Sequence, residues 1–306
     1  MSFENLIGNQ SVKNILNNAI SKNSILHSYM FVGNSGIGKS LFAMEFAKMI
    51  LCQNNDEKCN DCSSCIKFES GNNPDFFRID SCGKSIKIEQ IREMQVKVIE
   101  KPIISNKKVY IINDADLMTV EAQNCLLKTL EEPPEYIVII LIVSNENKIL
   151  NTIKSRCMKI NFKQIDDMEI KNYISVNFDL SNVDDNILKL CNGSIGKFIS
   201  IKDRLEEYSQ IGKIFLNMNN SINVVMNEAE LIYKNKEIIT DYLEYMSVVL
   251  YKKCTENVYN NEVFINCINI IEDTKKRLYN NGNYDMCIDN LLISMWEEFN
   301  EKGSRS

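Results

Sequence analysis

The sequence predicts an α/β fold built on a parallel β-sheet, followed by smaller all-helical domains. Short apolar runs rich in Ile, Val and Tyr recur through the first half of the chain, and each ends in polar or turn-forming residues. Runs of this length and composition are typical of strands buried on both faces of a parallel sheet. Helical patterns lie between them, as expected of β–α–β units. The runs are at residues 29–33, 76–80, 108–114, 137–145 and 158–162.

Two helices of this part can be identified directly. Residues 40–52 are apolar on nearly every side, as expected of a helix packed against a sheet. Thr119 is a predicted N-cap for a second helix, which has Glu121 in its first turn. The pair Pro133-Pro134 ends that helix, because proline cannot continue it.

After Phe162 the strand pattern disappears and only helical periodicity remains. Residues 164–174 and 186–201 predict short helices, with Gly193 as a C′ residue. From about Asp203 onward the helices are long and amphipathic. Two of their apolar stripes are Ile239, Tyr242, Leu243, Met246 and Leu250, and Ile288, Leu291, Leu292, Met295 and Phe299. The predicted domains are an α/β domain at 1–163, a small helical domain at 164–203 and a helical domain at 204–306.

Composition and charge exclude several classes of protein. The chain is 44% hydrophobic and 25% charged, which is ordinary for a soluble globular protein. A net charge of -6 argues against a surface built throughout to grip nucleic acid, because phosphate neutralisation needs clustered Lys and Arg. The start lacks a secretion signal, and the longest apolar run, 137–143, is too short to span a bilayer. We therefore expect a cytoplasmic protein without membrane contact, whose eleven cysteines are reduced.

Residues 33–40 (GNSGIGKS) match the phosphate-binding pattern G-x-x-x-x-G-K-[ST]. They follow a predicted strand and precede a predicted helix, which is the context that the motif requires. Gly33, Gly36 and Gly38 let backbone N–H groups turn toward phosphate oxygens. Lys39 can reach the terminal phosphates and Ser40 can ligate magnesium. The pattern predicts nucleotide-binding ancestry, but a loop can keep its shape after binding is lost, so ATP and Mg²⁺ binding stays open.

Four cysteines cluster within a short polar stretch, residues 52–65. Cys52, Cys59, Cys62 and Cys65 give the spacing C-x6-C-x2-C-x2-C. Because C-x2-C lets two thiolates of one turn meet a single ion, the four predict a closed tetrahedral Zn²⁺ site with a structural role. An iron–sulfur cluster could use the same thiolates. A group of packing cysteines without metal is the remaining alternative.

The third predicted strand ends in a damaged acidic motif. An active P-loop ATPase ends this strand in Asp-Glu, which hold magnesium and polarise the attacking water. Here Asn113 stands in the Asp position and Asp114 in the Glu position. Asn113 is uncharged and Asp114 is one methylene short, so the motif predicts impaired hydrolysis. A register shift could recruit Asp114 or Asp116 instead, or these two could merely cap the following helix.

Ser155, Arg156 and Cys157 follow the fourth predicted strand and its loop. An exposed Arg156 could reach the γ-phosphate of a neighbouring subunit, where a planar guanidinium stabilises transferred charge. It could equally be an ordinary surface residue. The lone His27 has no acidic partner nearby and is expected to be a packing or helix-end residue.

Taken together, these motifs resemble those of bacterial DNA polymerase III clamp-loader subunits, of the AAA+ class. The resemblance rests on the phosphate loop, the cysteine insertion, residues 117–134 (LMTVEAQNCLLKTLEEPP) and the triplet Ser155-Arg156-Cys157. It covers most of the first 200 residues, whereas the C-terminal third matches only in helicity and length. The resemblance implies a RecA-like P-loop domain, a small helical lid and a helical collar that joins a ring of five subunits.

Within this family the sequence is similar to the δ′ subunits rather than to the τ/γ motor subunits. Asn113 breaks the acidic pair, and residues 193–197 (GSIGK) lack the arginine that motors carry after Gly-Ser. The chain also ends after one helical domain, without the long tail of τ. The resemblance implies that Arg156, beside Ser155, is an arginine finger for the neighbour's ATP. It implies that the four clustered cysteines are zinc ligands.

The expected function is that of a structural stator in the clamp loader, with its own ATPase activity absent or weak. The implied partners are the τ/γ and δ subunits in a hetero-pentamer, the sliding clamp, and primed DNA through the assembled complex. Some δ′ subunits lack the P-loop lysine, whereas Lys39 and Ser40 stand here, so binding without turnover is conceivable. The alternative is an active motor subunit that uses Asp114. A zinc-containing nucleic-acid-binding module is disfavoured by the acidic balance and the absence of interleaved aromatic and basic residues.

Overall fold

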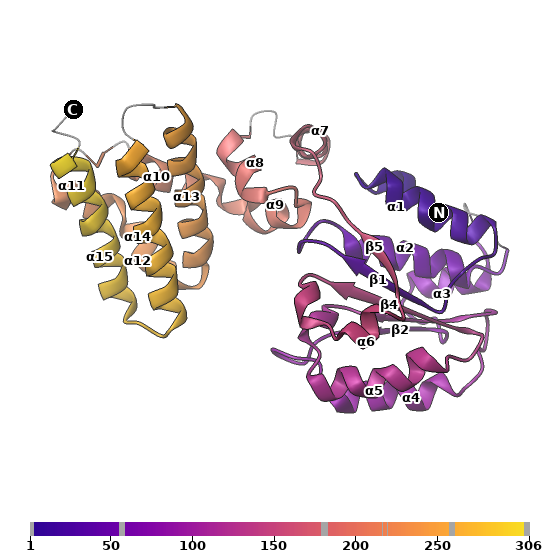
Figure 1. Cartoon of the computed structure of the whole chain (residues 1–306). Coiled ribbons are helices and arrows are strands. Elements are labelled where there is room, and N and C mark those ends of the chain that lie inside the picture. Colours follow the sequence, from indigo (N-terminus) through magenta and orange to yellow (C-terminus); the bar gives the residue numbers. More distant parts are fainter. Residues whose placement is uncertain are drawn as a thin grey trace. The chain divides into compact units, whose positions relative to one another are not determined.

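The computed structural model divides the chain into two compact units (Figure 1). The first unit is Met1–Asn172 with Gly193–Gly196, and the second is Tyr173–Asn192 with Lys197–Ser306. The structure describes residues 3–54, 59–178, 183–215, 217–218, 220–256 and 261–302. Residues 55–58 of the predicted cysteine insertion therefore lie outside the described residues. The division into three domains stays a prediction.

The first unit is built on a five-stranded parallel sheet with the order β2-β3-β4-β1-β5. All five strands predicted from the sequence are confirmed. They are β1 (Ser28–Val32), β2 (Phe76–Ile79), β3 (Lys108–Ile112), β4 (Ile137–Val143) and β5 (Met158–Asn161). The central strands β3 and β4 are buried along their whole length, as expected. The edge strands β2 and β5 are largely exposed or half-buried, so burial on both faces is limited to the middle of the sheet.

Helices cover both faces of this sheet (Figure 1). The first face packs against α1, α2 and α3, and the second against α4, α5 and α6. Side chains alternate between the two cores along β1, because successive strand residues point to opposite faces: Phe31 enters the first core and Met30 the second. The helices are α1 (Gln10–Ser21), α2 (Lys39–Leu51), α3 (Ser63–Glu69), α4 (Ile88–Val98), α5 (Val120–Glu131) and α6 (Asn151–Lys154), with short 3-10 turns η1 (Phe3–Asn5), η2 (Ala115–Leu117) and η3 (Glu146–Lys148).

The ends of α5 follow the local sequence signals. The Thr119 side chain accepts a hydrogen bond from the backbone N–H of Ala122 at 3.3 Å, so the predicted N-cap is confirmed. The helix ends at Glu131, just before Pro133-Pro134. Both ends of α5 are thus set by residues within or next to the helix.

The second unit is all-helical among its described residues. The predicted apolar stripes are buried, with Leu243 in α13 and Leu291 in α15 both at 0% exposure. Phe299 is half-buried beyond the end of α15. The elements are α8 (Asp185–Cys191), α10 (Leu205–Ile214), α11 (Ile222–Glu228), α12 (Glu230–Lys234), α13 (Ile239–Glu256), α14 (Asn261–Tyr279) and α15 (Tyr284–Glu297), with η4 (Lys202–Arg204), η5 (Lys236–Ile238) and the π-helical η6 (Glu298–Lys302).

Two helices are divided between the units. α7 (Asp167–Phe178) begins in the first unit, and α9 (Ile195–Ile201) has its first two residues there. α8 ends with two left-handed residues, Asn192 at φ 47° and Gly193 at φ 76°, which agrees with the predicted C′ glycine. Within the described residues, no helix is long and apolar enough to cross a membrane.

A buried carboxylate holds the loop that leads into β3. Asp75 is fully buried and accepts hydrogen bonds from the backbone N–H groups of Ile103 (2.6 Å), Ile104 (2.8 Å) and Ser105 (2.7 Å). The Ser105 hydroxyl in turn donates to the carbonyl of Leu51 at 2.7 Å and lies 3.0 Å from the hydroxyl of Ser64. The loop is thereby tied to the end of α2 and to α3.

We expect Asp75→Ala to lower the free energy of unfolding by about 3 kcal/mol, because three backbone N–H groups lose a buried, charged acceptor. Urea unfolding of the purified chain measures this loss. Asp80→Ala removes a half-exposed carboxylate just after the same strand and is the control, with an expected loss below about 1 kcal/mol. Equal losses for the two variants would contradict the role of Asp75.

Candidate functional site

The phosphate loop lies between β1 and α2, at the carboxyl edge of the sheet. Gly36 and Gly38 have φ values of 74° and 94°, which only glycine adopts easily. At Gly33 a Cβ would lie 2.6 Å from the Ile37 side chain and 2.9 Å from the Phe162 carbonyl. The three glycines of the motif are thus needed for the shape of this loop.

Lys39 points back into the loop. Its amino group donates to the carbonyls of Gly33 and Asn34, both at 2.6 Å, and to the hydroxyl of Ser144 at 3.2 Å. Burial lowers the pKa of the Lys39 amino group, and the charges of two nearby carboxylates, Asp114 and Asp116, act in the opposite direction. A phosphate group would therefore have to replace the loop's own carbonyls as the partner of this amine. Ser40, the other predicted ligand, is half-buried in the first turn of α2.

The damaged acidic motif lies at the same edge, because β3 and β1 run in parallel. The Asn113 amide donates to the carboxylate of Asp80 at 3.2 Å. Asp114 has left-handed backbone geometry, with φ 47°, and makes no side-chain capping bond to η2 in the described structure. The capping alternative is therefore wrong for Asp114. Asp116 accepts a hydrogen bond from the backbone N–H of Ser144 at 3.0 Å, which ties the end of β3 to the end of β4.

A close backbone contact beside the phosphate loop could not be foreseen from the sequence. The backbone N–H of Gly196 donates to the carbonyl of Gly36 at 3.0 Å. A Cβ at position 196 would lie only 2.9 Å from the Cα of Gly36. The start of α9 thus packs on the loop so tightly that no side chain fits there.

The structure brings the four predicted cysteines together. Cys52 follows α2, Cys62 is the N-cap of α3 and Cys65 lies within it. Their sulfur atoms and that of Cys59 all lie within 4.8 Å of one another, and all four residues are buried. Thiolates around one tetrahedral zinc are about 3.8 Å apart, because each Zn–S bond is about 2.3 Å. The cluster could therefore hold a metal ion after small inward movements.

Hydrogen bonding lowers the pKa of one of these thiols. Burial by itself raises the pKa of Cys62, but hydrogen bonds from the backbone N–H groups of Gln53 and Cys65 outweigh it and lower the pKa to about 6. A hydrogen bond to the Asp61 carboxylate raises the pKa of Cys59, and burial raises that of Cys65. Of these three cysteines, Cys62 is the one whose surroundings favour the thiolate.

Arg156 lies between α6 and β5, and its side chain is 35% exposed. Its Nη2 is 2.8 Å from the carboxylate of Glu131, and its Nη1 donates to the carbonyl of Thr152 at 2.8 Å. The hydroxyl of Ser155 is a longer acceptor, at 3.4 Å. The buried Ser28 hydroxyl donates to the Arg156 carbonyl at 2.6 Å, so the backbone is held as well.

The arginine and the phosphate loop lie at opposite edges of the sheet. Arg156 precedes β5 and is bonded to Ser28 at the start of β1, whereas the loop begins at Gly33 after the end of β1. Five residues of strand separate the two by about 16 Å. Arg156 therefore does not reach the phosphate loop of its own chain. His27 is exposed just before β1, so the packing role expected for it is wrong.

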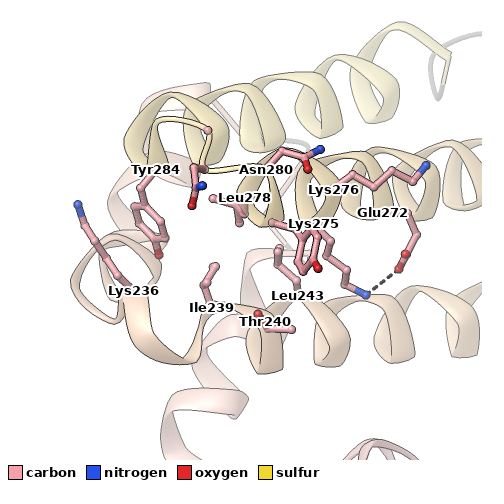
Figure 2. Close-up of a pocket in the computed structure, with 13 residues that line it drawn as sticks. Lys236, Ile239, Thr240, Leu243, Glu272, Lys275, Lys276, Leu278, Asn280 and Tyr284 are labelled. Carbon is pink, nitrogen blue, oxygen red and sulfur yellow. Dashed lines mark hydrogen bonds and ion pairs between the residues drawn. The ribbon is translucent and has the colours of Figure 1, made fainter. Parts of the chain in front are cut away.

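The second unit contains a groove of about 730 Å³ between α13 and the end of α14 (Figure 2). Its floor is apolar, with Ile239 and Leu243 beneath the rim. Two lysines at its rim form ion pairs. The amino group of Lys275 lies 2.6 Å from the carboxylate of Glu272, as Figure 2 shows. The amino group of Lys236 lies 3.3 Å from the carboxylate of Asp285. None of the predicted site residues lines this groove.

The sequence of the chain is similar to that of known DNA polymerase III subunits. The family described as DNA polymerase III, delta subunit matches residues 8–166. The chain is 38% identical over 184 residues to DNA polymerase III subunit delta′ of Bacillus subtilis, covering 58% of this chain and 56% of that protein. It is 36% identical over 221 residues to subunit gamma/tau of Mycoplasma pneumoniae, covering 70% of this chain but only 32% of that protein. It thus spans about a third of the length of such gamma/tau relatives.

A solved structure shows a similar fold. The crystal structure of a DNA polymerase III gamma subunit-related protein from Thermotoga maritima matches with a TM-score of 0.51. The match covers 92% of this chain and 99% of that chain, at 15% sequence identity. At this identity the likeness concerns the fold alone.

We expect the chain, purified under reducing conditions, to carry about one zinc ion, measured by elemental analysis. Metal occupancy should fall as the pH is lowered, because protons compete with the metal for the thiolates. Cys62→Ser should lose the metal, whereas Cys82→Ser, at an exposed cysteine outside the cluster, should keep it. Metal-free chain, or bound iron with visible absorbance, would contradict the zinc assignment.

Proposed function

The chain belongs to the DNA polymerase III delta-subunit family, and we propose that it serves in a clamp loader as the δ′ subunit. In this role it is a stator: it supports the ring and lends Arg156 to the ATP site of a neighbouring subunit. The sliding clamp is loaded on primed DNA by the assembled complex. The τ/γ and δ subunits are its proposed partners in a hetero-pentamer, with residues 204–306 as the collar and 164–203 as the lid.

The position of Arg156 carries this proposal. It lies at the amino edge of the sheet, about 16 Å from the phosphate loop of its own chain. A half-exposed, oriented guanidinium at that edge can serve a phosphate group only on another molecule. A finger acting in trans fits this placement, and the contacts with Glu131, Thr152 and Ser155 give the guanidinium a defined orientation.

The phosphate loop supports a stator rather than a motor. Asn113 carries no charge and its amide is used on Asp80. Gly196 leaves no room for a side chain against Gly36, so this position of the segment that carries an arginine in motors offers only backbone to the loop. We propose that the loop binds ATP and Mg²⁺ through Lys39 and Ser40 without efficient turnover, and that the cysteine cluster holds a structural zinc ion.

An active motor subunit is the second candidate. The similarity extends to gamma/tau subunits as well as to delta′. The carboxylates of Asp114 and Asp116 also lie close enough to Lys39 to act on its charge. Either could supply the carboxylate that Asn113 lacks. Direct turnover measurements separate the two candidates.

For the isolated chain we expect ATP–Mg²⁺ binding without steady-state hydrolysis, because the water-activating pair is broken at Asn113. Fluorescent-nucleotide titration and phosphate release measure the two properties. Lys39→Ala should abolish binding. Hydrolysis by the wild-type chain that disappears in Lys39→Ala would refute the stator assignment and favour a motor.

For the reconstituted complex we expect Arg156→Ala to slow ATP turnover at the site it serves by about 10³-fold, the scale of arginine-finger losses. Rapid-quench measurement of phosphate release resolves that site from the others. Arg92→Ala, at an exposed arginine of α4, is the control and should turn over normally. Both variants should keep the thermal midpoint of the wild-type chain. Full activity of Arg156→Ala would refute the finger.

A further inference from the structure

The carboxylate of Glu131 is the one acidic partner of Arg156 among the described residues. The ion pair joins Glu131 Oε1 to Arg156 Nη2 at 2.8 Å. We propose that Glu131 is a positioning residue that orients the Arg156 guanidinium for its phosphate target. This inference rests on the proposed function of Arg156 as a finger acting in trans.

The base of the arginine is already fixed by the fold. Its carbonyl accepts from the buried Ser28, and its own N–H donates to Ile153 at 3.0 Å. These backbone contacts do not fix the long side chain, which has large rotamer entropy. The Thr152 carbonyl holds Nη1, and Glu131 holds Nη2 from a different element, the last residue of α5. Two anchors from two helices define the plane of the guanidinium, which one anchor cannot do.

The pairing leaves capacity for a phosphate. A guanidinium has five N–H donors in a fixed fork, and each Nη carries two of them. Within the described structure, Nε makes no hydrogen bond and Nη2 keeps a second N–H, whereas Nη1 donates to the Thr152 carbonyl and, at 3.4 Å, to the Ser155 hydroxyl. The carboxylate is 49% exposed, so solvent screens its charge. Glu131 therefore orients the fork without occupying all of it.

The adjacent Glu132 provides a matched control. It has the same charge and is also exposed, but its side chain makes no hydrogen bond or ion pair in the described part of the chain. Both residues lie in segment 117–134, which carries part of the family resemblance. The sequence alone predicts no role for either of them. Only the structure distinguishes the two residues, because the carboxylate of Glu131 forms an ion pair with Arg156 and that of Glu132 does not in the described part of the chain.

The experiment is a double-mutant cycle in the reconstituted complex. Glu131→Gln should slow ATP turnover at the served site by about three- to tenfold, since small misplacements of a positioned group reduce rate on this scale or more. Glu132→Gln should leave turnover unchanged. In the Arg156→Ala background, Glu131→Gln should cause no further loss, because the group it orients is gone. Complex assembly and the thermal midpoint of the chain should match the wild type in every variant.

The outcomes separate the two ideas. If Arg156→Ala slows turnover but Glu131→Gln does not, or if the two losses multiply in the double variant, Glu131 has no positioning role while the finger stands. If Arg156→Ala keeps full turnover, the proposed function is wrong and this inference with it. Equal losses in Glu131→Gln and Glu132→Gln would indicate a general charge effect and would also overturn positioning.

A second readout needs only the purified chain. NMR spin relaxation of the Arg156 Nε–H group reports the mobility of the guanidinium. Glu131→Gln should increase that mobility and Glu132→Gln should not. Unchanged relaxation in Glu131→Gln would show that the carboxylate does not hold the side chain, whatever the kinetics.

Discussion

The parallel direction of the five strands is the constraint on which the other features depend. Parallel strands place every loop that follows a strand at one edge and every loop that precedes a strand at the other. Gly33, Asn113 and Ser144 therefore meet at the carboxyl edge, around Lys39. Arg156 and the end of α5 meet at the amino edge. The direction of the strands alone therefore places the phosphate loop and Arg156 at opposite edges of the sheet.

Polar ties, in addition to the packing of Phe68 in the first core, attach the cysteine insertion to this frame. The stretch around the cysteines is too polar to form a core of its own. Asp75 and Ser105 join the loop before β3 to α2 and α3 by buried hydrogen bonds, each of which satisfies a group that would be costly to bury unpaired. This hydrogen-bond network thus supports the insertion alongside the packing of Phe68.

Local signals account for what the sequence could predict. The strand runs, the Thr119 cap, the phosphate loop and the cysteine spacing can each be recognised within a short stretch of consecutive residues. Contacts between distant segments could not be predicted: Glu131 meets Arg156 across 25 positions, and Gly196 meets Gly36 across 160. These contacts depend on how the helices pack against the sheet. Uneven cover at the sheet edges likewise explains why β2 and β5 are more exposed than their apolar composition suggested.

The contact between Gly196 and Gly36 also limits the evolutionary paths open to this chain. Any side chain at position 196 collides with backbone, and backbone cannot move aside as the tip of a flexible side chain can. A substitution at this position, arginine included, would therefore require the start of α9 or the phosphate loop to shift, so residue 196 can change only together with compensating changes nearby.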